Sequence, residues 1–276
     1  MAQINVGIVG YGFVGQAVAH GFQDQNLFIA DPLYFNSSTA HLVNKKLDVV
    51  FICVPTPMGE NGHIDSHIVE QVIDELKHLD TILVLKSTVT PDIVDRLAKE
   101  HGKKFVYNPE FLREATAKKD FVNPTHHVFG GDQDTTDRLQ CIYEDYSICK
   151  PAQTFHVTPK EASFVKYGIN CFLASKVLFW NQFEEQCKRL GVNYNNVRYA
   201  IEGDPRIGES HMAVPGNDGR HGFAGPCFPK DTFAFVNLFP EFTVLKETIR
   251  VNNKIRSQYE LSDREKAQNI TYDHKI

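Results

Sequence analysis

The sequence predicts an α/β protein in which a Rossmann-like, doubly wound and mostly parallel sheet is followed by a helical domain. Three observations lead to this prediction. Over residues 1–157, short runs rich in Val, Ile and Leu alternate with helical patterns. These runs are continuously apolar, which is typical of strands that helices cover on both faces. After residue 157 the strand patterns cease and helical patterns remain.

Seven short apolar segments are expected to form strands, namely residues 4–9, 27–30, 49–54, 82–86, 105–107, 127–129 and 154–157. Helices are expected between them, for example over residues 68–79 and 135–146. Another helix is expected after the fifth strand, because Asn108 is a good N-cap residue and Pro109 suits the first helical position. On such a helix, Glu110 and Glu114 would share one face.

The second part begins at Thr158, where Thr-Pro-Lys-Glu is typical of a capping box with Pro at the first helical position. A helical pattern of about 30 residues follows, and Gly191 is a natural stop. Residues 203–231 are rich in Gly and Pro and are expected to form a long functional loop. Further helices are expected near Thr232 and Phe242, and the last fifteen residues are polar and expected to fray.

These patterns divide the 276 residues into three expected parts. The sheet domain spans residues 1–157, and the helical domain, with its 203–231 loop, spans residues 158–255. A polar tail covers residues 256–276.

Composition narrows the class of protein. The chain has 29 Lys and Arg against 34 Asp and Glu, a net charge of −5, which argues against a basic nucleic-acid-binding surface. No apolar run approaches the ~20 residues that span a bilayer, and the first residues lack the pattern of a secretory signal. The six Cys have neither metal nor disulfide spacing. We therefore expect a cytoplasmic protein with reduced thiols and no metal, nucleic-acid or membrane partner.

A glycine-rich turn predicts the cofactor site. Residues 10–15, Gly-Tyr-Gly-Phe-Val-Gly, follow an expected strand and open an expected helix. Gly10 allows the tight turn, Gly12 lets a pyrophosphate approach the backbone, and Gly15 lets the helix pack on the strand. The helix N-terminus then faces the phosphates. Asp31, sixteen residues after Gly15, ends the second strand and is expected to accept from the ribose hydroxyls and to repel a 2′-phosphate, which favours NAD over NADP.

Cys227 is the candidate nucleophile. It lies in Gly-Pro-Cys-Phe-Pro-Lys-Asp, residues 225–231, a polar loop in which a core thiol would be out of place. Lys230 would favour the reactive thiolate. On the long expected helix, Lys166 and Asn170 are four residues apart among apolar neighbours, which indicates either a satisfied polar network or a site.

Together these segments resemble the UDP-glucose/GDP-mannose dehydrogenase family, nucleotide-sugar dehydrogenases that oxidise a sugar alcohol to an acid. The segments that carry the resemblance are GIVGYGFVG, CVPTP (53–57), KSTVTP (86–91), NPEFLREATA (108–117), KYGIN (166–170), DPRIG (204–208) and GFAGPCFPKD (222–231). The CFPKD loop is most similar to the members that convert UDP-glucose to UDP-glucuronate. Ala224 stands where many members have Gly.

The resemblance implies a role for each matched residue. Cys227 would trap the aldehyde, and Lys166 and Asn170 would stabilise the oxyanion. Glu110 would act on water during thioester hydrolysis, and Asp231 would assist proton transfer. The expected catalytic residues are Cys227, Lys166, Asn170, Glu110, Asp231 and Thr88. The expected cofactor-binding residues are Gly10, Gly12, Phe13, Val14, Gly15, Asp31, Thr56, Thr88 and Glu114. The expected substrate-binding residues are Phe111, Leu112, Lys166, Asn170, Arg206, Gly222 and Lys230.

Several alternatives stay open. The substrate could be GDP-mannose or another nucleotide sugar. Members of the family normally add a second α/β domain that supplies much of the uridine pocket, and we expect this chain, which stops at Ile276, to lack it. It would then be a short form, rely on a partner chain, or serve only as an NAD-binding module. A two-electron hydroxyacid dehydrogenase is a third hypothesis, although such chemistry needs no thiol. The long helix is expected to be covered in a homodimer.

Overall fold

The computed structural model describes residues 3–273. The chain divides into two compact units, Met1–Thr56 with Asp65–Lys166 and Pro57–Ile64 with Tyr167–Ile276. Each unit has hydrophobic clusters of its own.

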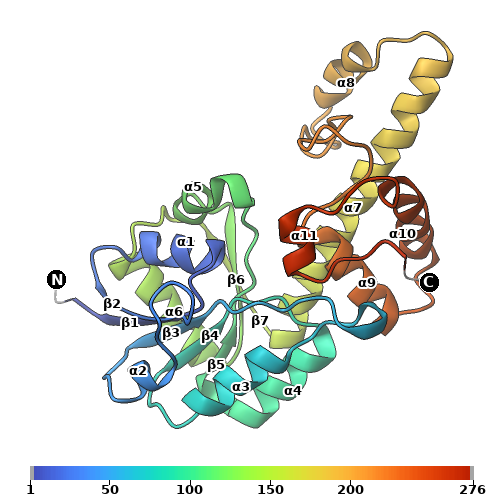
Figure 1. The fold of residues 1–276 in the computed structure, drawn as a ribbon. Coiled ribbons are helices and arrows are strands. Elements are labelled where there is room, and N and C mark those ends of the chain that lie inside the picture. The colour runs from blue at the N-terminus through green and yellow to red at the C-terminus, as the bar shows by residue number, and fades with distance from the viewer. Residues whose placement is uncertain (1–2, 274–276) are drawn as a thin grey trace. The chain divides into compact units, whose positions relative to one another are not determined.

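The first unit contains a seven-stranded sheet with the strand order β2-β1-β3-β4-β5-β6-β7 (Figure 1). The strands are β1 (Asn5–Val9), β2 (Asn26–Ala30), β3 (Val49–Ile52), β4 (Ile82–Leu85), β5 (Phe105–Tyr107), β6 (His126–Gly130) and β7 (Gln153–Val157). All neighbours pair in parallel except β5 and β6, which pair antiparallel at Tyr107 and Gly130. The expected Rossmann-like, mostly parallel sheet is confirmed.

Helices cover both faces of this sheet (Figure 1). They are α1 (Phe13–Gly21), α2 (Ala40–Val43), α3 (His67–Leu76), α4 (Pro91–His101), α5 (Ala117–Val122) and α6 (Gln133–Tyr146), with short 3-10 turns η2 (Gly102–Lys104) and η3 (Glu114–Thr116). One face packs against α3 and α4, and the other against α1, α5 and α6. Because β3 and β4 are buried on both faces, their residues are all apolar, as VVFI and ILVL show.

The second unit is helical. It contains η1 (Glu60–Gly62), the continuation of α7 (Pro159–Arg189), α8 (Tyr194–Glu202), α9 (Phe228–Leu238), α10 (Thr243–Arg256) and α11 (Asp263–Ala267). The expected capping box starts α7, since Glu161 N donates to Thr158 Oγ1 and Thr158 N donates to the Glu161 carboxylate. The long helix is therefore confirmed, with 31 residues.

Two expectations for this unit were wrong. The helix expected near Thr232 begins at Phe228, because Pro229 is tolerated in the first turn, and so the long loop ends at Cys227. The last fifteen residues do not fray as far as residue 273: α11 has its own capping box, and Ile270 and Tyr272 are buried in the core. Residues 274–276 lie outside the described residues.

Candidate active site

The glycine-rich turn connects β1 to α1 and has the geometry of a dinucleotide cradle. Gly10 has φ +86°, and a Cβ there would lie 2.7 Å from the Cys53 carbonyl oxygen. A Cβ on Gly15 would lie 2.0 Å from the Gly10 carbonyl oxygen, so that only glycine permits this packing. A Cβ on Gly12 would meet no atom within 4 Å. Open space over Gly12, at the N-terminus of α1, fits a pyrophosphate.

Asp31 follows β2 and is buried beside this turn. One carboxylate oxygen accepts from Tyr11 N (2.7 Å), and the other accepts from Leu33 N (2.8 Å) and Tyr34 N (2.9 Å). A carboxylate has about four acceptor positions, so one remains for a ribose hydroxyl. The turn and the Asp31 carboxylate therefore fit NAD. Phe13 and Val14 form the first turn of α1, and their expected part in cofactor binding stays a prediction.

Two further expected cofactor residues follow the carboxyl ends of neighbouring strands. Thr56 comes after β3 and Thr88 after β4, and both side chains are buried. Ser87 Oγ donates to the Val54 carbonyl at 2.6 Å and joins the two segments. In parallel sheets, ligands bind at this edge of the strands.

The helix expected over residues 108–114 is absent, which corrects the prediction. Residues 108–113 are irregular, and Glu114 starts the 3-10 turn η3 and is exposed. Glu110 and Glu114 therefore do not share a helical face. The reason is that the Asn108 side chain does not cap a helix. It lies buried, where Lys86 Nζ and Tyr143 OH donate to its Oδ1 (2.8 and 2.9 Å) and its amide donates to the Val128 carbonyl (3.0 Å).

Lys86 is a buried cation that sequence reasoning missed. Its Nζ also donates to the Asn108 carbonyl at 3.1 Å. Burial lowers the pKa of Lys86 to about 8. The Lys-Ser-Thr segment ends an apolar strand, and a lysine in that position was the available signal.

Glu110 and Lys166 form a buried ion pair within the first unit. Lys166 Nζ donates to Glu110 Oε1 (2.9 Å) and to the Glu110 carbonyl (2.6 Å). The two side chains are only 8% and 4% exposed. Leu112 N donates to the other Glu110 oxygen (2.7 Å), and the Phe111 ring lies 5.7 Å from Lys166 Nζ. The expected residues 110–112 and Lys166 are thus brought together.

Asn170 belongs to the second unit, where it bonds a second buried polar group. Its amide donates to Asp231 Oδ2 at 2.6 Å, and Lys230 Nζ donates to Asp231 Oδ1 at 2.6 Å. All three residues are buried. The α7 helix supplies Asn170, and the first turn of α9 supplies the other two. The structure pairs Lys230 with a carboxylate, and its expected effect on the Cys227 thiolate stays a prediction.

Cys227 is the N-cap residue of α9, one helical turn before Asp231. Its carbonyl accepts from Asp231 N at 2.9 Å, and the residue is partly exposed. The preceding segment contains Gly222, with φ +78°, whose N donates to Asn181 Oδ1 at 3.0 Å. A Cβ on Gly222 would lie 2.7 Å from Asn252 Oδ1, so glycine is required here. A partly exposed thiol at the start of a helix is a chemically accessible position.

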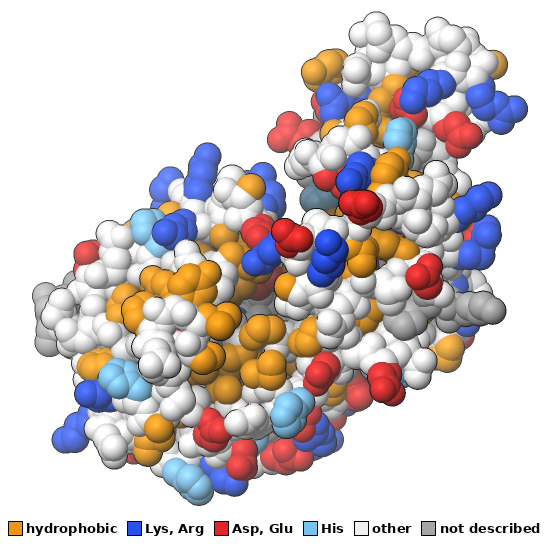
Figure 2. Space-filling view, viewed as in Figure 1, with side chains coloured by type: hydrophobic (Ala, Val, Ile, Leu, Met, Phe, Trp, Pro, Cys, Tyr) orange, Lys and Arg blue, Asp and Glu red, His pale blue; other side chains and the backbone are white. Residues whose placement is uncertain are grey.

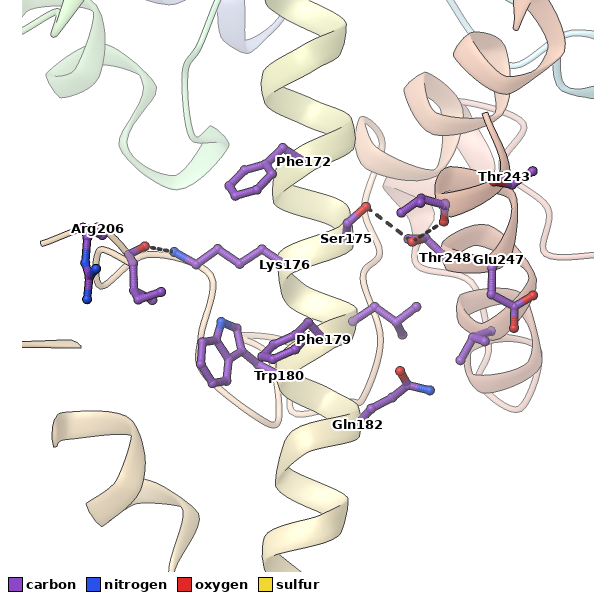
Figure 3. A pocket seen from close by; sticks show the side chains of 14 residues that line it. Phe172, Ser175, Lys176, Phe179, Trp180, Gln182, Arg206, Thr243, Glu247 and Thr248 are labelled. Atoms are coloured by element: carbon purple, nitrogen blue, oxygen red, sulfur yellow. Dashed lines mark hydrogen bonds between the residues drawn. The ribbon is translucent and has the colours of Figure 1, made fainter. Parts of the chain in front are cut away.

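Arg206 lies in the loop that follows α8 in the second unit. It is exposed and pairs with Asp204 at 2.6 Å, and it lines a hollow of about 760 Å³ (Figure 3). Apolar side chains of α7 and α10 form much of this hollow. Among them Phe172, Phe179 and Val244 are 67%, 56% and 67% exposed. Lys176 Nζ donates to the Ile207 carbonyl at 2.9 Å and holds the Arg206 loop against α7.

Two kinds of feature are absent from residues 3–273. No group of three or more His, Cys, Asp or Glu side chains there is arranged to hold a metal ion. None of the helices in this range is long and apolar enough to cross a membrane. On the face shown in Figure 2, acidic and basic side chains are interspersed.

Comparison with protein-family models matches both parts of the chain. Residues 29–147 match the NAD-binding domain of the UDP-glucose/GDP-mannose dehydrogenase family, and residues 160–254 match its central domain. The chain is 34% identical over 225 residues to UDP-glucose 6-dehydrogenase YwqF of Bacillus subtilis, covering 75% of this chain and 48% of that protein. The chain spans about half the length of the curated relatives it matches.

Solved structures agree with this assignment. A UDP-glucose dehydrogenase from Pyrobaculum islandicum has a TM-score of 0.76 and 28% identity, covering 92% of this chain and 68% of that one. A 3-hydroxyisobutyrate dehydrogenase from Mycobacterium tuberculosis has a TM-score of 0.73 and covers 98% and 97% of the two chains, but at 16% identity the likeness is one of fold alone. The chain belongs to the UDP-glucose/GDP-mannose dehydrogenase family of nucleotide-sugar dehydrogenases, and NAD is the cofactor that its N-terminal unit is built to bind.

Proposed function

We propose that this protein oxidises the primary alcohol of UDP-glucose to the carboxylate of UDP-glucuronate, using two NAD per sugar. The observation that carries the proposal is the start of α9. There Cys227 precedes, by one helical turn, an Asp231 carboxylate that is buried and hydrogen-bonded to Asn170 and Lys230. The similarity to relatives named UDP-glucose 6-dehydrogenase supports this choice of sugar nucleotide.

The reaction balances as a four-electron oxidation. Two hydrides leave the sugar carbon, one water supplies the second carboxylate oxygen, and three protons are released. NAD, when bound, accepts each hydride. The first oxidation gives an aldehyde, to which the Cys227 sulfur adds to form a thiohemiacetal. Loss of the second hydride leaves a thioester, and hydrolysis frees the acid and regenerates the thiol. Covalent capture divides one difficult oxidation into easier steps.

The remaining polar groups have the chemistry that these steps require. Lys166 and Asn170 present an ammonium and an amide, which are donors suited to a developing oxyanion. Asp231 holds or passes a proton, and Glu110 draws a proton from the hydrolytic water. Thr88 and Glu114 are proposed to contact the nicotinamide side of the cofactor, and Lys230 and Arg206 the substrate. We expect the reaction to take place in the cytoplasm, where thiols stay reduced.

We further infer that the protein forms a homodimer through α7. Phe172 and Phe179 on α7, with Val244 on α10, expose three large apolar side chains around one hollow. A second copy of this helix would cover them, since exposed apolar patches of this kind mark association surfaces. Sedimentation velocity of wild type and Phe179→Asp tests this inference. We expect a dimer for the wild type and a monomer for the variant; a wild-type monomer at micromolar concentration would contradict it.

The catalytic proposal is tested by trapping the thioester. Glu110→Gln should slow hydrolysis, so that protein mixed with UDP-glucose and NAD accumulates a sugar acyl adduct on the peptide containing Cys227, detectable by mass spectrometry. The exposed Glu185→Gln is a matched control and should show no accumulation. GDP-mannose, tested in parallel, should give no adduct. Acid formation that persists in Cys227→Ser would refute the covalent mechanism.

A further inference from the structure

Three buried side chains hold the segment that leads to Cys227. Gly222 N donates to Asn181 Oδ1 at 3.0 Å, Phe223 N to Asn252 Oδ1 at 2.7 Å, and Gly225 N to Glu265 Oε1 at 3.3 Å. These acceptors come from α7, α10 and α11 and are 5%, 1% and 2% exposed. The backbone ahead of the thiol is therefore fixed by acceptors from three separate helices.

Of the three acceptors, Glu265 holds the amide that is nearest to Cys227 in sequence, that of Gly225. It uses both carboxylate oxygens: Oε2 accepts from the N and Oγ of Ser262, which closes the capping box of α11. Oε1 accepts from Gly225 N and from Tyr272 OH, at 2.6 Å. Arg256 Nη2 lies 4.0 Å from Glu265 Oε1. Burial alone would raise the pKa of Glu265, but these hydrogen bonds outweigh it, and the pKa is lowered.

The segment that carries Glu265 is docked firmly on the second unit. Ile270 and Tyr272 are 3% and 7% exposed within the cluster that includes Phe233 of α9. Met58 N donates to the Gln268 carbonyl at 3.0 Å. The family's central-domain model ends at residue 254, so residues 262–272 lie beyond the part of the chain that it matches. This polar segment therefore supplies a buried carboxylate that contacts the cysteine loop.

We propose that Glu265 is a positioning residue for Cys227, and that residues 262–272, the C-terminal brace, hold the cysteine loop in one fixed conformation through the Gly225 amide. The Glu265 carboxylate fixes the backbone two residues before the thiol, and Tyr272 in turn orients the carboxylate. The effect of Glu265 on turnover rests on the proposed function, whereas its effect on the position of Cys227 does not.

The test measures the thiol directly. Iodoacetamide is added to wild type, Glu265→Gln and Tyr272→Phe, and alkylation of each cysteine is followed by peptide mass spectrometry. We expect Cys227 to react about fivefold faster in Glu265→Gln, because the loss of a charged acceptor frees the loop, and about twofold faster in Tyr272→Phe. Cys171 and Cys187, buried in the same unit, should keep their wild-type rates. Ser262→Ala is the matched control: it breaks the α11 cap but leaves both Oε1 contacts, and the Cys227 rate should not change.

Two results would overturn the proposal. One is a Cys227 rate in Glu265→Gln equal to that of the wild type. The other is an equal acceleration of Cys171 and Cys187, which would mean that the whole unit loosens. If Glu265→Gln does not fold, Tyr272→Phe decides by the same comparison. If the wild type forms NADH from UDP-glucose, the kcat of Glu265→Gln should fall below the wild-type value, while its KM for NAD should be unchanged. A wild type that forms no NADH refutes the proposed function, and alkylation still decides the role of Glu265.

Discussion

The buried pair of Lys166 and Glu110 makes a quantitative prediction about stability. Lys166→Met keeps most of the apolar volume but removes the cation that lies 2.9 Å from the Glu110 carboxylate, in a site where the side chains are 4% and 8% exposed. Removing one partner of a buried ion pair costs about 3–5 kcal/mol, because the other charge stays desolvated. For a unit of this size, such a loss lowers Tm by about 6–20 °C.

Urea unfolding of the first unit measures this loss. The transition is monitored with a fluorescent NAD analogue or by circular dichroism. Lys166→Met combined with Glu110→Gln should recover at least half of it, because the buried charge is then gone. Lys160→Met is the matched control on the same helix. Its pair with Asp95 is partly exposed, with side chains 50% and 28% exposed, and the urea midpoint should stay at the wild-type value. A Lys166→Met protein that unfolds within about 1 kcal/mol of wild type would refute the argument that Lys166 neutralises a buried carboxylate.

Three further predictions concern the first unit. Gly12→Ala should fold normally but bind NAD at least tenfold more weakly, measured by calorimetry. Gly15→Ala should lower Tm, because its Cβ would lie 2.0 Å from a backbone oxygen. Equal stability of the two variants would contradict this. The Lys86 pKa of about 8 lies below the ordinary 10.5, so the unfolded chain binds more protons and stability rises with pH. Relative to Lys86→Met, the wild type should gain about 1 kcal/mol between pH 7 and pH 9, measured by urea titration, and a flat difference would be evidence against a buried cation. In the wild type, kcat/KM should be at least about tenfold higher with NAD than with NADP. This preference should become smaller in Asp31→Asn, because the carboxylate repels a 2′-phosphate. An unchanged preference would mean that Asp31 does not select the cofactor.

The fold was largely predictable because the sheet is covered on both faces. Strands such as β3 and β4 must then be continuously apolar, and this pattern is visible without any tertiary information. The capping box at Thr158 likewise depends on residues adjacent in sequence. Local signals failed at Asn108. Asparagine is a common N-cap residue, but here its side chain accepts hydrogen bonds from Lys86 and Tyr143 in a buried network. Nothing near Asn108 in the sequence indicates those partners.

The sequence indicated that two candidate site residues have unusual surroundings, but it did not indicate their contacts. Lys166 and Asn170 stood out as polar groups among apolar neighbours, and both prove to be buried and hydrogen-bonded. Their expected roles on the substrate stay predictions. Glu265 could not have been found from sequence, because its neighbours are polar and only its contacts with Gly225 and Tyr272 explain its burial.

The stoichiometry of NADH formation tests the central claim most directly. With limiting UDP-glucose and excess NAD, the nicotinamide absorbance at completion gives the number of hydrides transferred per sugar. The covalent mechanism through Cys227 predicts two NADH per UDP-glucose and a UDP-glucuronate product. One NADH per sugar, or none in a protein that demonstrably binds NAD, would contradict it.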